Sequence, residues 1–328
     1  MRALILQQPG RLTWEEVPEP DRDGVLVAVR RVGICGTDIH AYGGRQPGAV
    51  YPIRLGHELA VEMLEDQPGT LCAVNPYLQC GRCIACRHGR TNCCATLSVM
   101  GVHCEGGLTR RLRIPASHLY ASDTLRPELL AMAEPLVVGH HAIRRAGLGS
   151  GDTVLVVGLG PIGLGVAQLA EVVGAKVVCA DVRADRRRAA YRITPHILNA
   201  QQEVAGPLKE MLDGDLPRTV IDATGSRQAM RHSYQLVAPG GQMVFVGLIT
   251  GDFAFKDLDF HRRELTLRAS RNGTAEDFAA IMHLLESRRL DPLWMITHRI
   301  AFNDLADRFA ALADTPNCIK AMVHMDRS

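Results

Sequence analysis

Apolar residues gather in short runs near the start of the chain, and glycine and proline separate the runs. Those at 2–7, 12–17 and 25–34 predict strands, the last of them rich in valine. A further strand is expected at 108–114, after a pair of glycines. The first part of the chain is therefore predicted to be mainly β.

The middle of the chain has a different pattern. The uninterrupted apolar run at 154–157 predicts a buried parallel strand. A helical pattern follows over 161–173, and a second strand over 176–181. Later apolar runs predict three more strands, over 220–224, 243–246 and 265–270. A mainly β start followed by such a centre predicts two domains of different class, the second a doubly wound parallel α/β domain.

Helices are also expected at 127–145, 275–287 and 303–313, and a final strand at 319–324. The first of these helices should be interrupted at Glu134, because a residue followed by proline is restrained toward extended geometry. Glu134 then either points at a specific site or is an ordinary solvent-facing acid at a helix end.

The sequence Gly158-Leu-Gly160-Pro161-Ile162-Gly163 joins the strand at 154–157 to its helix. Glycines at this spacing provide a tight turn, room for a pyrophosphate against bare backbone, and close packing of helix on strand. The N-terminus of the helix adds free N–H groups and a positive dipole for the phosphates. The pattern predicts a dinucleotide site, and a glycine-rich turn of an unrelated α/β fold is the alternative.

Asp181 ends the strand that follows, where an acidic side chain can accept hydrogen bonds from the adenosine ribose. A carboxylate at this position repels a 2′-phosphate, so the sequence favours NAD over NADP. Arg183, two positions further on, keeps NADP as the second possibility.

The chain has ten cysteines, and its first residues turn polar too soon for an export signal. The cysteines are therefore expected to be metal ligands or thiols in a reducing cytoplasm. Cys80, Cys83, Cys86 and Cys94 have the spacing of four thiolates around one tetrahedral structural zinc ion. Cys93 is the alternative fourth ligand, and a group of free surface thiols is the alternative to a metal site.

Cys35 and His57 are of the residue types that bind zinc, and Asp38 could hold a ligating histidine in its correct tautomer. Taken singly, each also has an ordinary explanation, such as a small buried cysteine or a hydrogen-bonded core histidine.

The composition is that of an ordinary globular protein, with 47% hydrophobic residues, 22% charged residues and a net charge of +2. This balance suggests neither a nucleic-acid nor a membrane partner. The most apolar stretch, 154–178, is interrupted by glycines, Pro161 and Glu171, and does not predict a membrane span. With 328 residues, the chain is long enough for two domains.

Together, these motifs resemble the zinc-dependent medium-chain dehydrogenases, the group of the alcohol, sorbitol and threonine dehydrogenases. The resemblance rests on Gly33-Ile-Cys-Gly-Thr-Asp-Ile-His40, Gly56-His-Glu58, the four-cysteine group, Glu134-Pro135 and the glycine motif with Asp181. It implies a mainly β GroES-like catalytic domain over 1–135 and 274–328, which carries both zinc sites. A Rossmann coenzyme domain would occupy 136–273.

By this resemblance, Cys35, His57 and Glu134 are ligands of a catalytic zinc, and Glu58 is a close neighbour that sometimes exchanges with bound water. Further coenzyme contacts, beside the glycine motif, Asp181 and Arg183, would come from Thr224, Val246 and Leu248.

The resemblance also implies a reaction. The zinc would lower the pKa of a substrate alcohol, and NAD would take the hydride. Thr37 and His40 correspond to the hydroxyl and the histidine of a proton relay to solvent.

Several short sequence segments resemble more closely the bacterial sugar-acid branch of the family. This branch includes L-galactonate and L-gulonate 5-dehydrogenases. The segments are Gly33 to His40 followed by Ala-Tyr-Gly-Gly44, Tyr51-Pro52, Arg90-Thr-Asn-Cys-Cys94, Val244-Phe-Val-Gly-Leu248 and Ser270-Arg-Asn272. This implies that a sugar acid is oxidised at a secondary alcohol. Arg54 and Arg271 are candidate partners for its carboxylate; a surface arginine or a contact to a coenzyme phosphate is the alternative for each.

Other functions stay open at this point. One is a polyol or L-threonine dehydrogenase of the same family. The others are a non-catalytic NAD(P)H-binding redox sensor, which the presence of Cys35, His57 and His40 disfavours, and a zinc-free quinone reductase, which the four cysteines and Glu134 disfavour. The family resemblance further implies a homo-oligomer, a dimer or a tetramer, in which 244–248 could extend a sheet across the interface.

Overall fold

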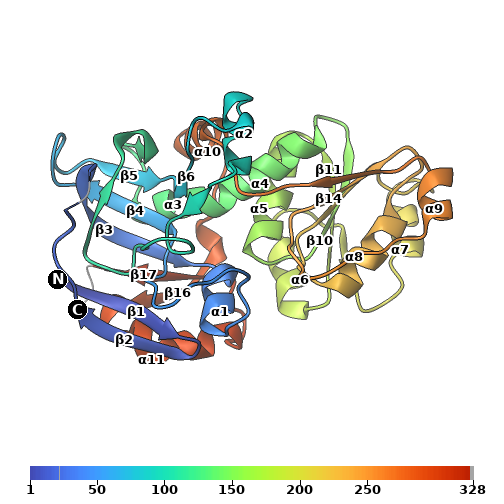
Figure 1. Cartoon of the computed structure of the whole chain (residues 1–328). Helices are drawn as coiled ribbons and strands as arrows, with labels where there is room; N and C mark the ends of the chain where they lie inside the picture. Colours follow the sequence, from blue (N-terminus) through green and yellow to red (C-terminus); the bar gives the residue numbers. More distant parts are fainter. Residues whose placement is uncertain (22, 326–328) are drawn as a thin grey trace. The chain divides into compact units, whose positions relative to one another are not determined.

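The computed structural model describes residues 1–21 and 23–325. The chain forms two compact units (Figure 1). The first contains Met1–Val137 and the segment that begins at Thr274, and the second contains Val138–Gly273. Helix α4 (Ala133–Ala146) leads from the first unit into the second.

The first unit is built on a seven-stranded sheet. Its strand order is β16 (Ile296–Ala301), β17 (Lys320–His324), β3 (Val25–Ile34), β4 (Glu58–Met63), β5 (Leu71–Val74) and β9 (Leu119–Ala121), with β8 (Arg111–Ile114) also paired to β3. Two smaller sheets pair β1 (Arg2–Gln8) with β2 (Arg11–Glu16), and β6 (Tyr77–Leu78) with β7 (Ser98–Val99). Among these described strands, only β16 and β17 pair in parallel. The predicted mainly β character of this part of the chain is confirmed.

Strand β3 shows why the chain folds this way. Its first half alternates buried Val25, Val27 and Val29 with partly exposed residues, as expected for a strand with one face on the core. Its last four residues are all buried, so both faces of this half of the strand are covered; its neighbours in the sheet are β17 and β4. The chain therefore enters the segment after Ile34 from the interior of the sheet.

Helices of the first unit are short, apart from α10. They are α1 (Gly36–Tyr42), α2 (Ile84–Arg87), α3 (Pro127–Ala131), α10 (Ala275–Glu286) and α11 (Leu305–Arg308). The start of α10 is stabilised by a capping box, in which the Thr274 N–H donates to Asp277 Oδ2 at 2.9 Å.

Two predicted helices differ from the structure. The break in 127–145 lies at Met132, and Glu134 belongs to the first turn of α4, so the prediction that Glu134 marks the break was wrong. Pro135 is tolerated in that turn because its missing N–H has no partner there. The segment 303–313 is only partly α-helical: α11 is flanked by 3₁₀ turns, which bury residues at the same three-residue spacing as an α-helix.

The strand predicted over 108–114 is shorter than expected. Only β8 pairs with β3, whereas Leu108 accepts a hydrogen bond from the Leu4 N–H at 3.0 Å and Thr109 forms an isolated bridge with Ala3. The apolar run thus pairs with β3 at one end and contacts β1 at the other, and the hydrophobic pattern does not distinguish the two partners.

The second unit contains a six-stranded sheet in which every pairing is parallel. The strand order is β12 (Ile197–Asn199), β11 (Lys176–Asp181), β10 (Thr153–Val157), β13 (Thr219–Asp222), β14 (Gln242–Phe245) and β15 (Thr266–Ala269). Its helices are α5 (Pro161–Val172), α6 (Ala184–Ala190), α7 (Ala205–Met211), α8 (Arg227–Ser233) and α9 (Asp257–Arg262). The predicted doubly wound α/β domain is confirmed.

The order of the strands identifies where a ligand can bind. The chain moves from β10 outward to β11 and β12, and then returns to build β13, β14 and β15 on the other side. Ligands of such sheets bind beyond the carboxyl ends of the strands at this reversal, between β10 and β13. The expectation that 244–248 extends the sheet across an interface was wrong, because β14 has a neighbour on each side.

None of the described helices combines the length and apolar character that crossing a lipid bilayer requires.

Candidate functional site

Cys35 lies where β3 ends and α1 begins. It is the N-cap of α1, and its N–H donates to Asp38 Oδ2 at 2.8 Å. The other oxygen of this fully buried carboxylate accepts a hydrogen bond from the Gly56 N–H at 3.3 Å. Asp38 thereby ties the start of α1 to the residue that precedes His57.

Glu58 is the first residue of β4 and His57 directly precedes it, and the pairing of Glu58 with Gly33 brings both close to Cys35. The ligand atoms of Cys35, His57 and Glu58 are all within 4.8 Å of one another. His57 Nδ1 is 3.6 Å from Asp38 Oδ1, too far for a hydrogen bond, and the side chain also has a hydrogen bond with Cys35. A thiolate, an imidazole and a carboxylate so arranged suit a zinc ion.

Glu134, the predicted third ligand, is not one of the three residues in that group. Its carboxylate is buried and accepts a hydrogen bond from the Tyr77 hydroxyl. Burial raises the pKa of Glu134, which the positive charge of His57 opposes and the negative charge of Glu58 reinforces. These couplings place Glu134 near the same charges.

The field around His57 favours a cation. Burial lowers the pKa of His57, but the negative charges of Asp38 and Cys35 outweigh burial and hold it well above its usual value. Glu134 acts in the same direction. An anionic, buried donor set of this kind fits a divalent metal ion.

Thr37 and His40 both lie on α1, directly after Cys35. Thr37 Oγ1 is 3.7 Å from Cys35 Sγ, whereas the His40 side chain is solvent-exposed. The part of the ring that is covered and the charge of Arg45 both lower the pKa of His40, which favours a neutral imidazole near neutral pH.

The four predicted structural ligands lie together around α2. Cys80, Cys83, Cys86 and Cys94 have their sulfur atoms within 4.8 Å of one another. The Cys83–Cys86 sulfur distance is 3.5 Å, close to the roughly 3.8 Å of two thiolates on one tetrahedral zinc. Backbone N–H groups of Arg82 and Cys83 lower the pKa of Cys80 to about 6, which favours the thiolate form. Cys93 is exposed and outside this group.

The glycine motif follows β10, and each glycine has a different constraint. Gly158 has φ +88°, which favours glycine. A methyl group on Gly163 would lie 1.7 Å from the Gly158 carbonyl oxygen, so the first turn of α5 packs directly on the loop. Gly160 is the N-cap of α5, and a methyl group there would meet no atom within 4 Å. Space is thus left open at the N-terminus of this helix.

Asp181 lies at the carboxyl end of β11, beside the glycine loop. Its Oδ2 accepts a hydrogen bond from the Leu159 N–H at 2.6 Å, and its Oδ1 accepts one from the Arg183 N–H at 2.7 Å. The Arg183 guanidinium is turned to Asp185, with Nε and Nη2 at 3.0 and 2.7 Å from the two carboxylate oxygens. Asp181 is therefore fixed in place, and Arg183 is engaged by another acid.

The other predicted coenzyme residues follow β13 and β14. Thr224 lies against Gly158, since a methyl group on that glycine would be 2.7 Å from Thr224 Cγ2. The Val246 N–H donates to the Asp222 carbonyl oxygen at 2.9 Å, and Leu248 is highly exposed. All of them lie at the carboxyl ends of the strands.

The two candidate arginines differ in their surroundings. Arg54 is buried, and its Nε donates to the Gly106 carbonyl oxygen at 2.7 Å and lies 3.6 Å from Glu105. Arg271 is solvent-exposed. The buried contacts of Arg54 indicate a role in holding the loop, which leaves Arg271 as the better candidate for a substrate contact.

Sequence reasoning missed Lys320 and Tyr77. Lys320 Nζ is 2.5 and 2.6 Å from the two oxygens of Glu58, and the Tyr77 hydroxyl contacts Glu134. Lys320 and Glu58 are separated by 262 positions, so no local motif connects them. The one available signal was a lysine inside an apolar strand, where a charge needs a partner.

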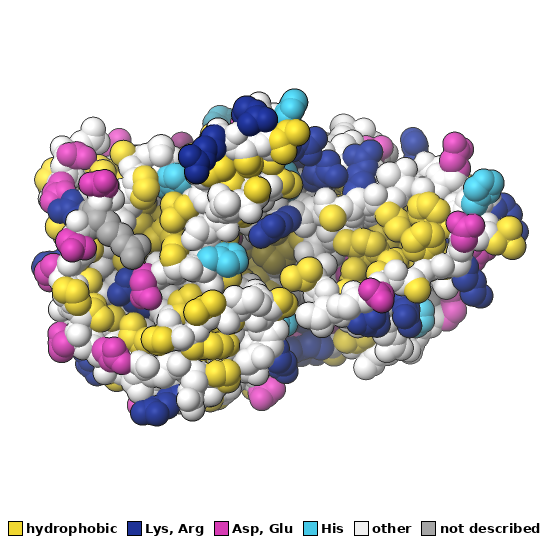
Figure 2. All heavy atoms as spheres, viewed as in Figure 1, with side chains coloured by type: hydrophobic (Ala, Val, Ile, Leu, Met, Phe, Trp, Pro, Cys, Tyr) yellow, Lys and Arg dark blue, Asp and Glu magenta, His cyan; other side chains and the backbone are white. Residues whose placement is uncertain are grey.

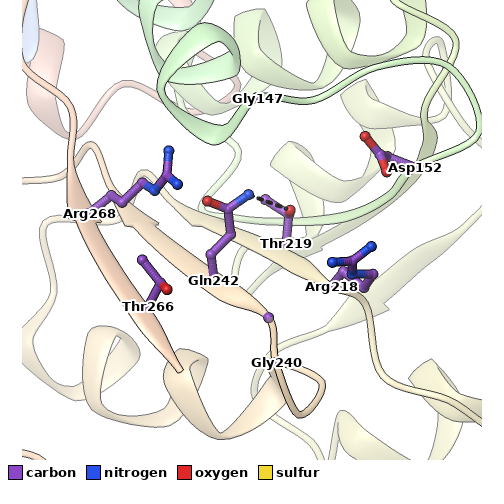
Figure 3. Close-up of a pocket in the computed structure, with 9 residues that line it drawn as sticks. Gly147, Asp152, Arg218, Thr219, Gly240, Gln242, Thr266 and Arg268 are labelled. Carbon is purple, nitrogen blue, oxygen red and sulfur yellow. Dashed lines mark hydrogen bonds between the residues drawn. The ribbon is translucent and has the colours of Figure 1, made fainter. Parts of the chain in front are cut away.

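A cavity of about 260 Å³ lies at the opposite end of the six-stranded sheet (Figure 3). It is lined by the first residues of β13, β14 and β15, and Gln242 donates within it to Thr219 Oγ1 at 3.2 Å. None of the predicted site residues lines it.

Two family models match the chain. One, described as alcohol dehydrogenase GroES-like domain, matches 21–124, and the other, described as zinc-binding dehydrogenase, matches 161–287.

The similarity to known proteins extends over almost the whole chain. L-galactonate-5-dehydrogenase of Escherichia coli (strain K12) is 42% identical over 320 residues, which cover 94% of each chain. The crystal structure of rspB from E. coli CFT073, described as a short chain alcohol dehydrogenase complexed with NADH, has a TM-score of 0.91 at 28% identity and covers 99% of both chains. L-idonate 5-dehydrogenase from E. coli has a TM-score of 0.89 at 25% identity, covering 99% of this chain and 98% of that one.

Proposed function

Because the chain belongs to the zinc-dependent medium-chain dehydrogenases, we propose that it transfers a hydride from a secondary alcohol of a sugar acid to NAD. It is an oxidoreductase that acts on CH–OH groups with zinc and a nicotinamide coenzyme. The observation that carries the proposed substrate class is the 42% identity to an L-galactonate dehydrogenase along 94% of the chain. A substrate like L-galactonate or L-gulonate follows from it.

In this proposal, Cys35, His57 and Glu134 hold the catalytic zinc, and Cys80, Cys83, Cys86 and Cys94 hold the structural one. The catalytic zinc, when bound, would lower the pKa of the substrate hydroxyl. The Thr37 hydroxyl would accept the substrate proton as it donates its own to a hydroxyl of the coenzyme ribose, and His40, exposed on the same helix, would pass the proton on to solvent. The glycine motif, Asp181, Thr224, Val246 and Leu248 bind the coenzyme. The catalytic and coenzyme domains are proposed to divide at 135/136 and at 273/274.

We expect the zinc-loaded protein to reduce NAD⁺ with L-galactonate or L-gulonate, and more slowly or not at all with sorbitol, L-threonine or simple alcohols. The measurement is NADH absorbance at 340 nm with this panel of substrates. Activity confined to polyols or L-threonine would keep the family and contradict the sugar-acid substrate. No activity on the whole panel, in protein that binds two zinc ions and NAD, would contradict the substrate class as well.

The same assay tests the contact to the substrate carboxylate. Arg271→Ala should lower kcat/KM for the sugar acid by roughly 10- to 150-fold, because a hydrogen bond to a charged group contributes about 1.5–3 kcal/mol. Arg271→Lys should lose less, and the residual activity on an uncharged polyol should not change. Equal losses on both substrates would remove the carboxylate role.

The coenzyme preference gives a second test. We expect the enzyme to prefer NAD⁺ over NADP⁺ by a factor on the order of 100 in kcat/KM, because the Asp181 carboxylate repels a 2′-phosphate. Asp181→Ser should reduce this ratio at least about tenfold. Asp185→Asn, which releases Arg183 and leaves Asp181 intact, is the matched variant and should shift the ratio less. A wild-type preference for NADP⁺ would refute the assignment.

We further propose a cytoplasmic homo-oligomer, a dimer or a tetramer. Figure 2 shows apolar side chains on the surface of the second unit. Leu248 and Leu258 of this unit are 74% and 79% exposed. Among the described strands, β15 is at the edge of its sheet, where a strand of another copy could pair with it. The cytoplasmic location is proposed because a cluster of four thiolates needs a reducing compartment. Light scattering of the purified protein measures the mass, and a monomer would contradict the proposal.

A further inference from the structure

Lys320 is a fully buried lysine in the first unit, at the start of β17. Its side chain is 1% exposed. The ammonium contacts both oxygens of Glu58, at 2.5 and 2.6 Å, and the Ile34 carbonyl oxygen at 3.3 Å. A buried charge is retained only with such partners, so Lys320 and Glu58 depend on each other.

The contact crosses three adjacent strands, and Gly33 makes it possible. Gly33 lies on β3, paired with Glu58 of β4 on one side and with Met322 of β17 on the other. A methyl group on Gly33 would lie 2.0 Å from Glu58 Oε2. The Glu58 carboxylate therefore passes over the bare backbone of Gly33 to reach the lysine.

Glu58 also belongs to the group whose ligand atoms could hold a metal ion, with Cys35 and His57. A carboxylate that binds an ammonium through both oxygens has less electron density to offer a metal, and its position is fixed by the lysine. Two partners thus compete for one carboxylate: the metal site on one side and Lys320 on the other.

We propose that Lys320 is a positioning residue of the catalytic zinc site, which holds Glu58 on the β3 side as a counter-charge and keeps it from becoming a permanent ligand. The zinc is then left to Cys35, His57 and Glu134, with a position for substrate. This inference rests on the proposed catalytic zinc site, but not on the identity of the substrate.

The test uses Lys320→Met, which keeps the length of the side chain and removes its charge. With Co²⁺ in place of the catalytic zinc, the visible absorption bands report the number of ligands. We expect the variant to lose several-fold in band intensity, as the freed Glu58 adds a ligand. We also expect kcat of the zinc enzyme to fall about 10- to 100-fold, the usual effect of removing a residue that orients a metal ligand.

Three further variants complete the design. The double variant Lys320→Met/Glu58→Gln should recover the wild-type Co²⁺ spectrum, because an amide is a poor ligand. Gly33→Ala should reproduce the spectral change with Lys320 intact, since its methyl group displaces the carboxylate; it supplies the test if Lys320→Met does not fold. Lys176→Met, which removes a surface lysine of the second unit, should leave spectrum and activity unchanged.

A wild-type spectrum in folded Lys320→Met or Gly33→Ala would overturn the proposal and leave Lys320 a structural residue. Failure of the sugar-acid assay would not produce this result, because the spectrum is recorded without substrate. The two proposals therefore fail independently.

Discussion

Cys35→Ser is expected to lower kcat/KM for the sugar acid by at least about 10³-fold and to reduce the zinc content from two ions to one per chain. Cys35 is the only cysteine in the group with His57 and Glu58 among the described residues. Without its thiolate the site binds the metal more weakly. The metal stabilises the transition state by several kcal/mol, and each 1.36 kcal/mol that is lost lowers the rate tenfold. Metal analysis and steady-state kinetics of the purified variant measure both effects.

Cys93→Ser is the matched control, because Cys93 is exposed and lies outside both ligand groups. It should keep two zinc ions and full activity. If Cys35→Ser retained two zinc ions and most of its activity, Cys35 would not be a catalytic ligand. If Cys93→Ser lost a zinc ion, the assignment of Cys94 as the fourth structural ligand would be wrong.

Gly163→Ala is expected to destabilise the coenzyme unit by about 3 kcal/mol, the upper range for forcing an extra methyl group into packed structure. The added carbon would lie 1.7 Å from the Gly158 carbonyl oxygen, which is backbone and cannot rotate away. Thermal unfolding should begin roughly 6–12 °C lower. Because the glycine loop must shift, NAD affinity should fall at least about tenfold. Calorimetry and NAD titration measure the two effects.

Gly160→Ala separates folding from binding in the same loop. Gly160 has φ −69° and ψ −176°, which alanine adopts without strain, and its methyl group would meet no protein atom within 4 Å. The unfolding temperature should therefore stay within about 2 °C of the wild type. NAD affinity should still fall about tenfold or more, since that space is where a pyrophosphate approaches the backbone. Unchanged NAD affinity in Gly160→Ala would show that the coenzyme phosphates lie elsewhere.

The amino-acid sequence alone determined the features that depend on residues close together in the chain. The parallel strands β10 and β11, the glycine loop between β10 and α5, and the acid Asp181 follow from local apolar runs and from the special conformations of glycine. The four-cysteine group was also predictable, because its members lie within one short segment and their spacing matches one tetrahedral ion.

Periodicity was less informative about where elements end. It marked a helical face over 303–313 but did not separate α from 3₁₀ turns, since both bury every third or fourth residue. It also placed the helix break at Glu134 from the proline alone, whereas the break lies at Met132 and the proline fits the first turn of α4.

Only the tertiary structure decided how the charges of the catalytic site are balanced. Glu58 and Lys320 are 262 positions apart and meet because β17 and β4 flank the same half of β3, with Gly33 leaving room between them. The contact of Tyr77 with Glu134 likewise joins residues 57 positions apart. No local sequence pattern marks such pairs. A buried charge or hydroxyl without a partner costs free energy, and pairing removes that cost. The cost arises only once the strands have come together and buried these groups.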